Sequence, residues 1–135
     1  MNTVMPLLSE KEGHTIIKSF FNVYNQLGSG FMEAVYQEAL CEEFKLNNVP
    51  FQKEAKLNIW YNDNKLDKYY KADFICYEQI IIELKTTPVL IDAHFKQVIN
   101  YLKATKYPLA YLVTFGGKSL KSKRIINTNS VNPSV

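Results

Sequence analysis

The sequence predicts an α/β domain with a mixed sheet, in which three antiparallel strands form a meander and a fourth strand runs parallel to the third. Two observations predict the meander: residues 51–61 alternate apolar and polar side chains, and residues 69–85 contain two aromatic and β-branched runs around a very short turn. The third observation is a helical pattern in residues 92–105, followed by the apolar run 108–115. A strand–helix–strand connection is almost always a right-handed crossover, which places its two strands parallel.

The length and composition are those of a single soluble domain. With 135 residues, 47% of them apolar and 21% charged, the chain is long enough to bury a core. We expect one domain over residues 1–126 and a disordered tail over residues 127–135. No segment approaches the roughly 20 apolar residues of a membrane span. A cytoplasmic protein without a membrane partner is therefore expected.

The charge and the cysteines exclude some kinds of site. The net charge of +3 is too small to predict tight, autonomous binding to nucleic acid. Cys41 and Cys76 lie far apart and lack the CxxC spacing of zinc sites. They are expected to be buried free thiols in a reducing compartment.

Two helices are predicted before the sheet. Ser9 and Glu12 have the spacing of a capping box, so the first helix is expected to run from about Ser9 to Leu27. Gly28–Gly30 ends it, and Ser29 can cap the second helix, which is expected over residues 31–47. The first helix would pack through an apolar stripe made of Ile16, Ile17, Phe20, Phe21, Tyr24 and Leu27.

The second helix places a carboxylate on an otherwise amphipathic stripe. Glu33 precedes Tyr36, Leu40 and Phe44 at helical spacing. On a core-facing stripe Glu33 is costly unless it is paired or bound to an ion. In the first helical turn, however, a negative charge is favoured by the helix dipole and its head can lie in water. The spacing leaves both interpretations open.

The second and third strands carry the charged residues that bear on function. If the loop between them is Tyr77–Gln79, then Asp73 lies opposite Glu83, with Cβ atoms roughly 4.5–5.5 Å apart. A two-residue loop would instead place Asp73 opposite Leu84 and separate the carboxylates. Alternation puts Glu83 and Lys85 on the same face of their strand. The register therefore decides whether a site exists.

Two carboxylates this close repel each other unless a cation lies between them. Oxygen ligands favour a hard divalent ion, so the pair predicts a site for Mg²⁺ or Mn²⁺. The Glu-x-Lys pattern alone is a weak signal, because it occurs three times in the chain. Only Glu83–Lys85 follows a triple-isoleucine strand and has an aspartate, Asp73, on a partner strand. The alternative is an exposed strand pair with solvated charges.

The third helix should begin at a cap supplied by Asp92 and end near Thr105. Its predicted packing face consists of Phe95, Val98, Ile99 and Leu102. A separate stripe of His94, Gln97 and Tyr101 is either a solvated face or part of a site. After the apolar strand 108–115, the basic segment 118–124 is expected to be a solvated edge strand, with phosphate contact as the alternative.

These residues resemble a known family. Asp73 followed by Glu83-Leu84-Lys85 is similar to the active-site signature of the PD-(D/E)XK nuclease superfamily, with Ala72 where the superfamily name has proline. Gly30-Phe31-Met32-Glu33-Ala34-Val35-Tyr36 resembles the pattern of the GxxExxY family, a bacterial branch of that superfamily. The resemblance covers about residues 12–126, and Gln97 and Tyr101 follow in the expected order.

The resemblance implies a restriction-endonuclease-like core flanked by helices and metal-dependent hydrolysis of phosphodiester bonds in nucleic acid, with DNA as the expected substrate. In this scheme Mg²⁺ or Mn²⁺ would be held by Asp73, Glu83, the backbone carbonyl of Leu84 and Glu33. Lys85 would orient the attacking water or stabilise the pentacovalent state.

Gln97 and Tyr101 would position the substrate or Lys85. The alternative is a non-catalytic module that keeps the nuclease fold and binds nucleic acid or a protein. The small net charge is compatible with a protein partner or a homodimer.

Overall fold

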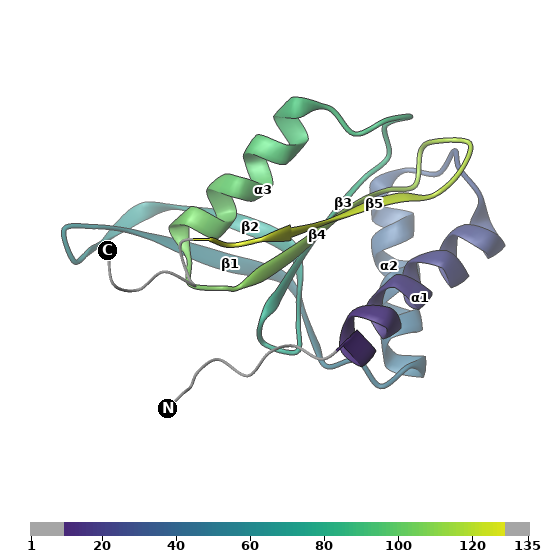
Figure 1. Ribbon diagram of the computed structural model, residues 1–135, viewed down its shortest axis with the longest axis horizontal. Helices are drawn as coiled ribbons and strands as arrows, with labels where there is room; N and C mark the ends of the chain where they lie inside the picture. The colour runs from purple at the N-terminus through teal and green to yellow at the C-terminus, as the bar shows by residue number, and fades with distance from the viewer. Residues whose placement is uncertain (1–9, 129–135) are drawn as a thin grey trace.

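The computed structural model describes residues 10–128, whose elements are labelled in Figure 1. In chain order they are α1 (Glu10–Leu27), α2 (Glu33–Leu46), β1 (Phe51–Tyr61), β2 (Asn64–Cys76), β3 (Ile80–Lys85), α3 (Asp92–Ala104), β4 (Leu109–Thr114) and β5 (Lys121–Ile126). Among these residues there is no helix with the length and apolar character that a membrane crossing requires.

The five strands form one sheet in the order β1-β2-β3-β4-β5. Neighbouring strands are antiparallel except β3 and β4, which are parallel and joined through α3. The predicted mixed sheet, with a meander and a crossover helix, is confirmed. This arrangement, flanked by helices, is a restriction-endonuclease-like fold. The prediction that the basic segment after β4 forms an edge strand is confirmed as well, because β5 closes the sheet beside β4.

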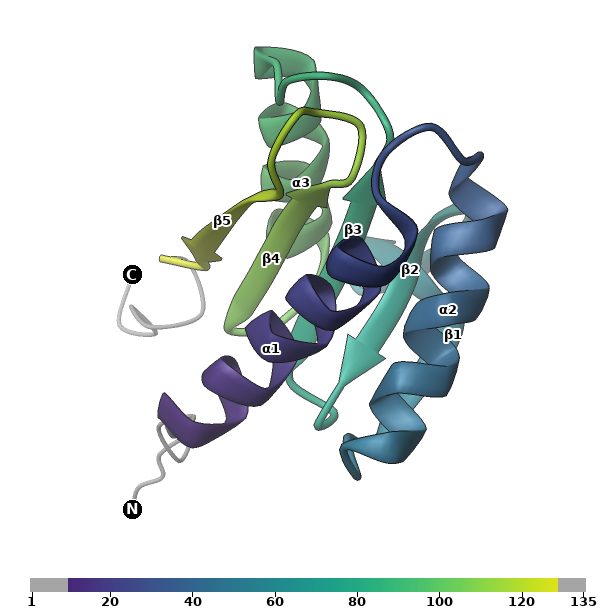
Figure 2. The same ribbon diagram turned by 90° about the vertical axis from the view of Figure 1, so that its right-hand side faces the viewer.

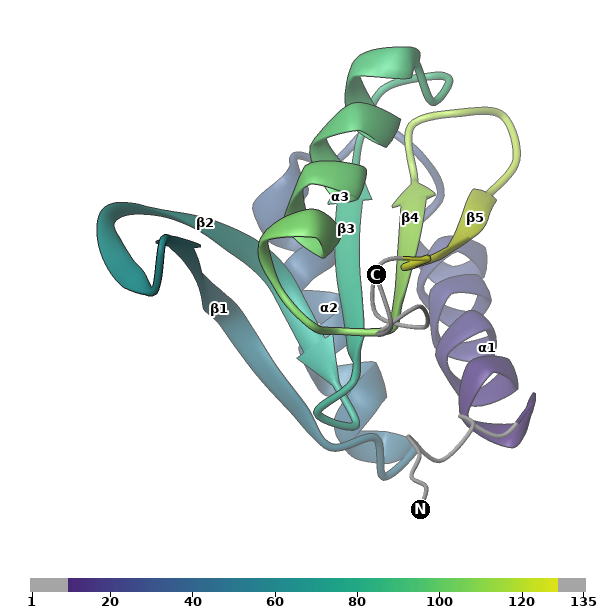
Figure 3. The same ribbon diagram turned by 60° about the vertical axis from the view of Figure 1, so that its left-hand side comes forward.

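Helices cover both faces of the sheet. Figure 2 shows α1 and α2 on one face, and Figure 3 shows α3 on the other. The core under α1 and α2 contains most of the large buried rings, among them Phe20, Tyr36, Phe44, Phe74 and Phe115. The core under α3 is largely aliphatic and includes Leu57, Ile75, Ile81, Val98 and Leu112. Strands β3 and β4 are buried on both faces because they lie between these two cores.

Strands β1 and β2 extend past the rest of the sheet as a two-stranded ribbon (Figure 3). The pairing is interrupted opposite Asp73, where Glu54 adopts a φ of 51°. It resumes with Ala55 opposite Ala72, shifts register between Asn58 and Trp60, and ends at the tip with Tyr61 opposite Asn64. One end of this ribbon therefore lies at the predicted carboxylate pair, and the other projects into solvent.

Two predicted helix caps are wrong. The sequence predicts Ser29 as the cap of the second helix, but α2 begins at Glu33 and its N-cap is Met32, whose side chain makes no capping hydrogen bond. The extra residues form a turn in which Gly28 and Gly30 have φ values of 67° and 113°. The Tyr36 hydroxyl holds this turn, donating to the Gly28 carbonyl and accepting from the Phe31 N–H at 3.3 Å.

The cap of α3 is Ile91 rather than Asp92, because the Nδ1 atom of His94 accepts the Ile91 N–H at 3.2 Å. The packing face of this helix is also rotated from the prediction, since Ile99 is 41% exposed and Tyr101 only 5%. The cause is the ribbon: the Tyr101 ring packs against Tyr70 of β2, with 4.9 Å between centroids.

The chain termini limit two further predictions. Ser9, half of the predicted capping box, lies outside the described residues, as do residues 129–135 of the predicted tail. Asn127, at the predicted start of that tail, is buried, and its side-chain amide donates to the carbonyls of Leu102 and Tyr107, both at 2.8 Å. Asn127 therefore belongs to the folded part of the chain.

Candidate active site

The site forms where β2 and β3 separate. Their pairing runs from Cys76 opposite Ile80 to Phe74 opposite Ile82. The loop is therefore the three residues Tyr77–Gln79, and the register that places Asp73 opposite Glu83 is confirmed. Tyr77 and Glu78 take φ values of 55° and 58°, which gives the tight left-handed turn that this loop requires.

Side chains continue the hydrogen bonding beyond the last paired residues. The Leu84 N–H donates to Oδ2 of Asp73 at 2.8 Å, and the Asp73 N–H donates to Oε1 of Glu83 at 3.2 Å. Each carboxylate thus takes the place of a backbone carbonyl on the neighbouring strand. The two acidic groups are held at the point of divergence by the backbone and do not depend on a flexible loop.

Both carboxyl groups are difficult to ionise in this position. Glu83 is only 7% exposed, and its burial, followed by the charge of Asp73, raises its pKa to about 8, while Lys85 opposes the rise. Burial also raises the pKa of Asp73, and repulsion from Glu33 adds to this effect. The hydrogen bond from the Leu84 N–H works in the opposite direction. The neighbouring ammonium and N–H groups of the protein therefore offset only part of the cost of ionising Asp73 and Glu83.

Lys85 lies between the acidic pair and α3. Its ammonium donates to Oε1 of Gln97 at 2.8 Å and lies 3.8 Å from Oε2 of Glu83. The hydrogen bond to Gln97 thus restricts the direction of the Lys85 ammonium. His94 is one turn away on α3, and burial followed by the charge of Lys85 lowers its pKa.

Tyr101 has a different environment from Gln97. Its hydroxyl donates to the backbone carbonyl of Lys71 at a long distance of 3.4 Å, and its ring packs on Tyr70. Burial, followed by the charges of Glu83 and Asp73, raises its pKa. Tyr101 therefore anchors the root of the β1–β2 ribbon against α3, beside the carboxylates.

Glu33 approaches the site from α2. It lines a cleft of about 300 Å³ together with Asp73 and Leu84. Its charge raises the pKa of both Asp73 and Glu83, although the Glu33 side chain itself is exposed. Glu33 lies in the first turn of α2, in contact with water, as the second interpretation of its position predicts, and it shares the cleft with Asp73.

Contacts within the Gly30–Tyr36 segment fix the position of Glu33 at the start of α2. Gly30 needs its positive φ for the turn before α2, and Tyr36 closes that turn through its hydroxyl group. The Tyr36 ring is fully buried and stacks on Phe115 with 4.6 Å between centroids. The first turn of α2, including Glu33, is therefore fixed relative to the sheet.

The available ligands suit a hard divalent cation. Successive residues of a strand direct their carbonyls to opposite sides, and the Lys85 carbonyl accepts the Phe115 N–H next to β4. The Leu84 carbonyl must therefore point toward β2, as its N–H does. Two carboxylates and one carbonyl form an oxygen-only set of the kind that Mg²⁺ and Mn²⁺ prefer. Within residues 10–128 no three His, Cys, Asp or Glu groups come together around one position, so Glu33 stands apart from the other two acids.

Three polar residues that line the cleft are absent from the predicted site: Gln37, Glu54 and Lys71. In the sequence, Glu54 belongs to Glu54-Ala55-Lys56, one of the two other Glu-x-Lys patterns. Its left-handed φ of 51° is unfavourable for a residue with a side chain, and such conformations cluster at functional sites. No sequence signal places Glu54 opposite Asp73, because the pairing of β1 and β2 shifts register between Asn58 and Trp60.

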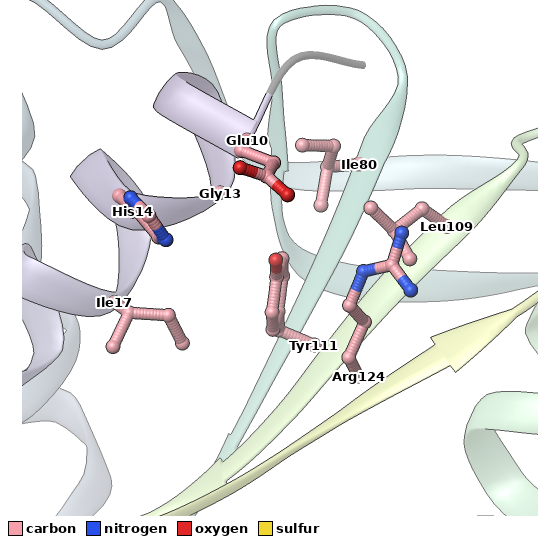
Figure 4. A pocket seen from close by; sticks show the side chains of 8 residues that line it. All are labelled: Glu10, Gly13, His14, Ile17, Ile80, Leu109, Tyr111 and Arg124. Atoms are coloured by element: carbon pink, nitrogen blue, oxygen red, sulfur yellow. The ribbon is translucent and has the colours of Figure 1, made fainter. Parts of the chain in front are cut away.

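A separate cavity lies at the other end of β3 and β4. It has a volume of about 340 Å³ and is lined by residues of α1 and the sheet, including Glu10, His14, Tyr111 and Arg124 (Figure 4). None of the predicted site residues lines it.

Comparisons with known proteins agree with this geometry. A family model described as the PD-(D/E)XK nuclease superfamily matches residues 10–125. No curated protein and no solved structure matches the chain.

Proposed function

Because the chain belongs to the PD-(D/E)XK nuclease superfamily, we propose that it hydrolyses phosphodiester bonds of nucleic acid with the help of a divalent cation. The observation that carries this proposal is the pair Asp73 and Glu83 at the divergence of β2 and β3, with Lys85 held beside it by Gln97. The same proposal includes the GxxExxY branch, DNA as the substrate and a cytoplasmic location.

The residues divide into two groups by their chemistry. Asp73, Glu83 and the Leu84 carbonyl would hold Mg²⁺ or Mn²⁺, with Glu33 reaching the same ion or a second one. When bound, such an ion lowers the pKa of a water molecule and offsets the negative charge that develops on the phosphate. Negative charge that is otherwise costly at Asp73 and Glu83 becomes favourable in its presence.

Lys85 would act on the reacting atoms. Its ammonium can orient the attacking water or stabilise the oxygens of the phosphate as the bond to the leaving oxygen breaks. Gln97 accepts from this ammonium and so restricts where it points. Gln97 is therefore a positioning residue, and Tyr101 supports the strand that carries Asp73.

The test is a cleavage assay on single- and double-stranded DNA and RNA with Mg²⁺, Mn²⁺ or a chelator. We expect cleavage only with metal, and we expect Lys85→Ala to abolish it. Lys85 is not a ligand, so the metal affinity of Lys85→Ala should equal or slightly exceed that of the parent. Lys45→Ala is a matched control, because Lys45 forms only an exposed ion pair with Glu42 at 3.7 Å.

Two outcomes would contradict the proposal. If Lys85→Ala cuts a substrate as fast as the parent does, the proposed mechanism is excluded. If the parent cuts none of the four substrates with either metal, the non-catalytic alternative, a module that binds nucleic acid or a protein, becomes the better explanation.

A further inference from the structure

The β1–β2 ribbon has one packed face and one open face. Leu57 and Tyr70 lie opposite each other and belong to the core under α3. The next pairs along the ribbon, Lys56 with Lys71 and Asn58 with Tyr69, must point to the other face because strand side chains alternate. Lys56, Lys71 and Tyr69 are all exposed there. The open face thus combines two lysines with an aromatic ring.

This open face leads directly to the candidate active site. Lys71 lines the same cleft as Asp73 and Glu33. Lys56 lies opposite Lys71, and its ammonium is 4.4 Å from the centroid of the Tyr69 ring, a cation–π contact that limits its movement. From Asp73 outward to Lys65, near the tip, an extended strand spans roughly 26 Å. Cationic groups therefore begin at the cleft and continue along the ribbon.

Aromatic side chains are exposed toward the tip. Trp60 is 58% exposed and Tyr61 is 68% exposed, although neither takes part in the hydrophobic cores. Trp60 also lines a concave region of about 720 Å³ between the ribbon and the end of α3, together with Lys56, Lys103 and Lys106, so this region meets the open face at Lys56. Exposed rings next to lysines are the features with which proteins hold single strands, since bases stack on the rings and phosphates contact the ammonium groups.

We propose that the β1–β2 ribbon binds a single strand of nucleic acid and guides it to the cleft of Asp73. This inference rests on the proposed nuclease function and adds the class of substrate. A duplex fits less well, because stacked base pairs cover the base faces that Trp60 and Tyr61 would contact. Asp63 and Asp67 lie near the tip and offset positive charge there, so stacking on Trp60 and Tyr61 is expected to contribute to the affinity beside charge.

The only tryptophan of the chain, Trp60, provides a direct test. The full-length protein is titrated in a chelator, which prevents cleavage, with a 12-nucleotide thymidine oligomer or with a mixed-sequence 12-base-pair duplex. We expect the single strand to quench the fluorescence of Trp60. The duplex should need at least about tenfold higher concentrations to reach the same quenching.

Variants locate the contacts through the fluorescence anisotropy of a labelled oligomer. Trp60→Ala should weaken binding at least about fivefold, and Trp60→Phe should restore part of the loss, as expected for stacking. Lys56→Ala/Lys71→Ala should reduce the slope of log affinity against log salt by about 1.4, which corresponds to two phosphate contacts on a single strand. Lys18→Ala/Lys45→Ala removes the same charge from exposed positions on α1 and α2 and should leave the slope unchanged.

The outcomes separate this inference from the proposed function. If the protein cuts nucleic acid but Trp60 is not quenched and Trp60→Ala binds like the parent, the ribbon is not the binding surface and the nuclease proposal stands. If Trp60 is quenched but no substrate is cut, the ribbon binds a strand and the nuclease proposal fails. Stronger quenching by the duplex would overturn the assignment to single strands.

Discussion

The electrostatic cost of the acidic pair can be measured through Asp73→Asn, even before a substrate is known. The substitution is nearly isosteric, and the asparagine carbonyl can still accept the Leu84 N–H, which donates to Asp73 at 2.8 Å in the parent. It removes one negative charge beside Glu83. The charge of Asp73 is the second cause, after burial, of the rise in the pKa of Glu83 to about 8.

The sign of the effect follows from this raised pKa. Between its value of 4.5 in the unfolded chain and about 8 in the folded protein, the folded state binds more protons at Glu83 than the unfolded state does. Stability contributed by this group is therefore present at low pH and lost as the pH rises through that window. We expect the metal-free parent to melt at a lower temperature at pH 8 than at pH 5, beyond the difference shown by a control variant.

The magnitude can be estimated for the metal-free protein at pH 8. Each unit of pKa corresponds to about 1.4 kcal/mol, and repulsion from Asp73 accounts for only part of the shift. Asp73→Asn should therefore stabilise the fold by on the order of 1 kcal/mol, or raise its melting temperature by about 4 °C. Asp67→Asn, an isosteric change at an exposed position of the ribbon, should leave the melting temperature nearly unchanged.

A bound metal ion should reverse the order of the melting temperatures of the parent and Asp73→Asn. An ion at about 100 times its dissociation constant adds about 2.7 kcal/mol to the stability of a native state that binds it. For a domain of this size that is roughly 10 °C in melting temperature. The parent should show this rise with Mg²⁺ or Mn²⁺, and Asp73→Asn should lose most of it.

The assay is thermal melting of both proteins across a metal titration at pH 5 and pH 8, with potassium chloride at matched ionic strength as the control for screening. The reasoning is refuted if Asp73→Asn melts well below the metal-free parent and both proteins respond equally to metal. Asp73 would then be a structural residue, and the proposed site would be wrong.

Three other predictions concern the groups around the pair. Gln97→Ala should lower kcat by about 10- to 100-fold with little change in KM, because the Lys85 ammonium loses the hydrogen bond that restricts its direction. A rise in KM of that size with kcat unchanged would instead place Gln97 in substrate binding. Tyr36→Phe should cost about 1 kcal/mol of stability in a thermal melt, because the partly buried Phe31 N–H loses its acceptor and the Gly28 carbonyl its donor, whereas Tyr61→Phe at the exposed tip should cost nothing. Glu33→Gln should weaken Mg²⁺ or Mn²⁺ binding by about tenfold in calorimetry if Glu33 reaches an ion, and tighter or unchanged binding would show that Glu33 acts only by repulsion.

The sequence was sufficient to predict the sheet, and it reduced the register of the central hairpin to two alternatives set by the length of its loop. The alternation of 51–61, the triple isoleucine at 80–82 and the apolar run 108–115 each reflect how many faces of the strand are buried. Burial makes register specific, because a slip of one residue would exchange the two faces of β3 and direct the Glu83 carboxylate into the core under α1 and α2, where Ile82 packs. The sequence left the opposition of Asp73 and Glu83 as one of two alternatives, and the three-residue loop of the structure decides in its favour.

Features that depend on tertiary contacts could not be predicted in this way. Tyr101 is buried and Ile99 is exposed because α3 packs against Tyr70 of the ribbon. The helical spacing of the apolar residues does not predict this contact. Likewise, the left-handed backbone of Glu54 arises where the pairing of β1 and β2 is interrupted. The true caps of α2 and α3 follow from Tyr36 and His94, which lie inside the helices.

The physical cost of the site separates the nuclease proposal from a purely structural or binding role. Glu83 is almost fully buried beside Asp73, and Lys85 is the only cation in ion-pair contact with it among residues 10–128. Neutral or apolar residues of similar volume would stabilise the same strands at least as well, because buried charges rarely repay their desolvation. The exposed ribbon could bind a strand without them. An acidic pair that is costly in the folded protein therefore favours the proposal of metal-dependent catalysis over a purely structural role.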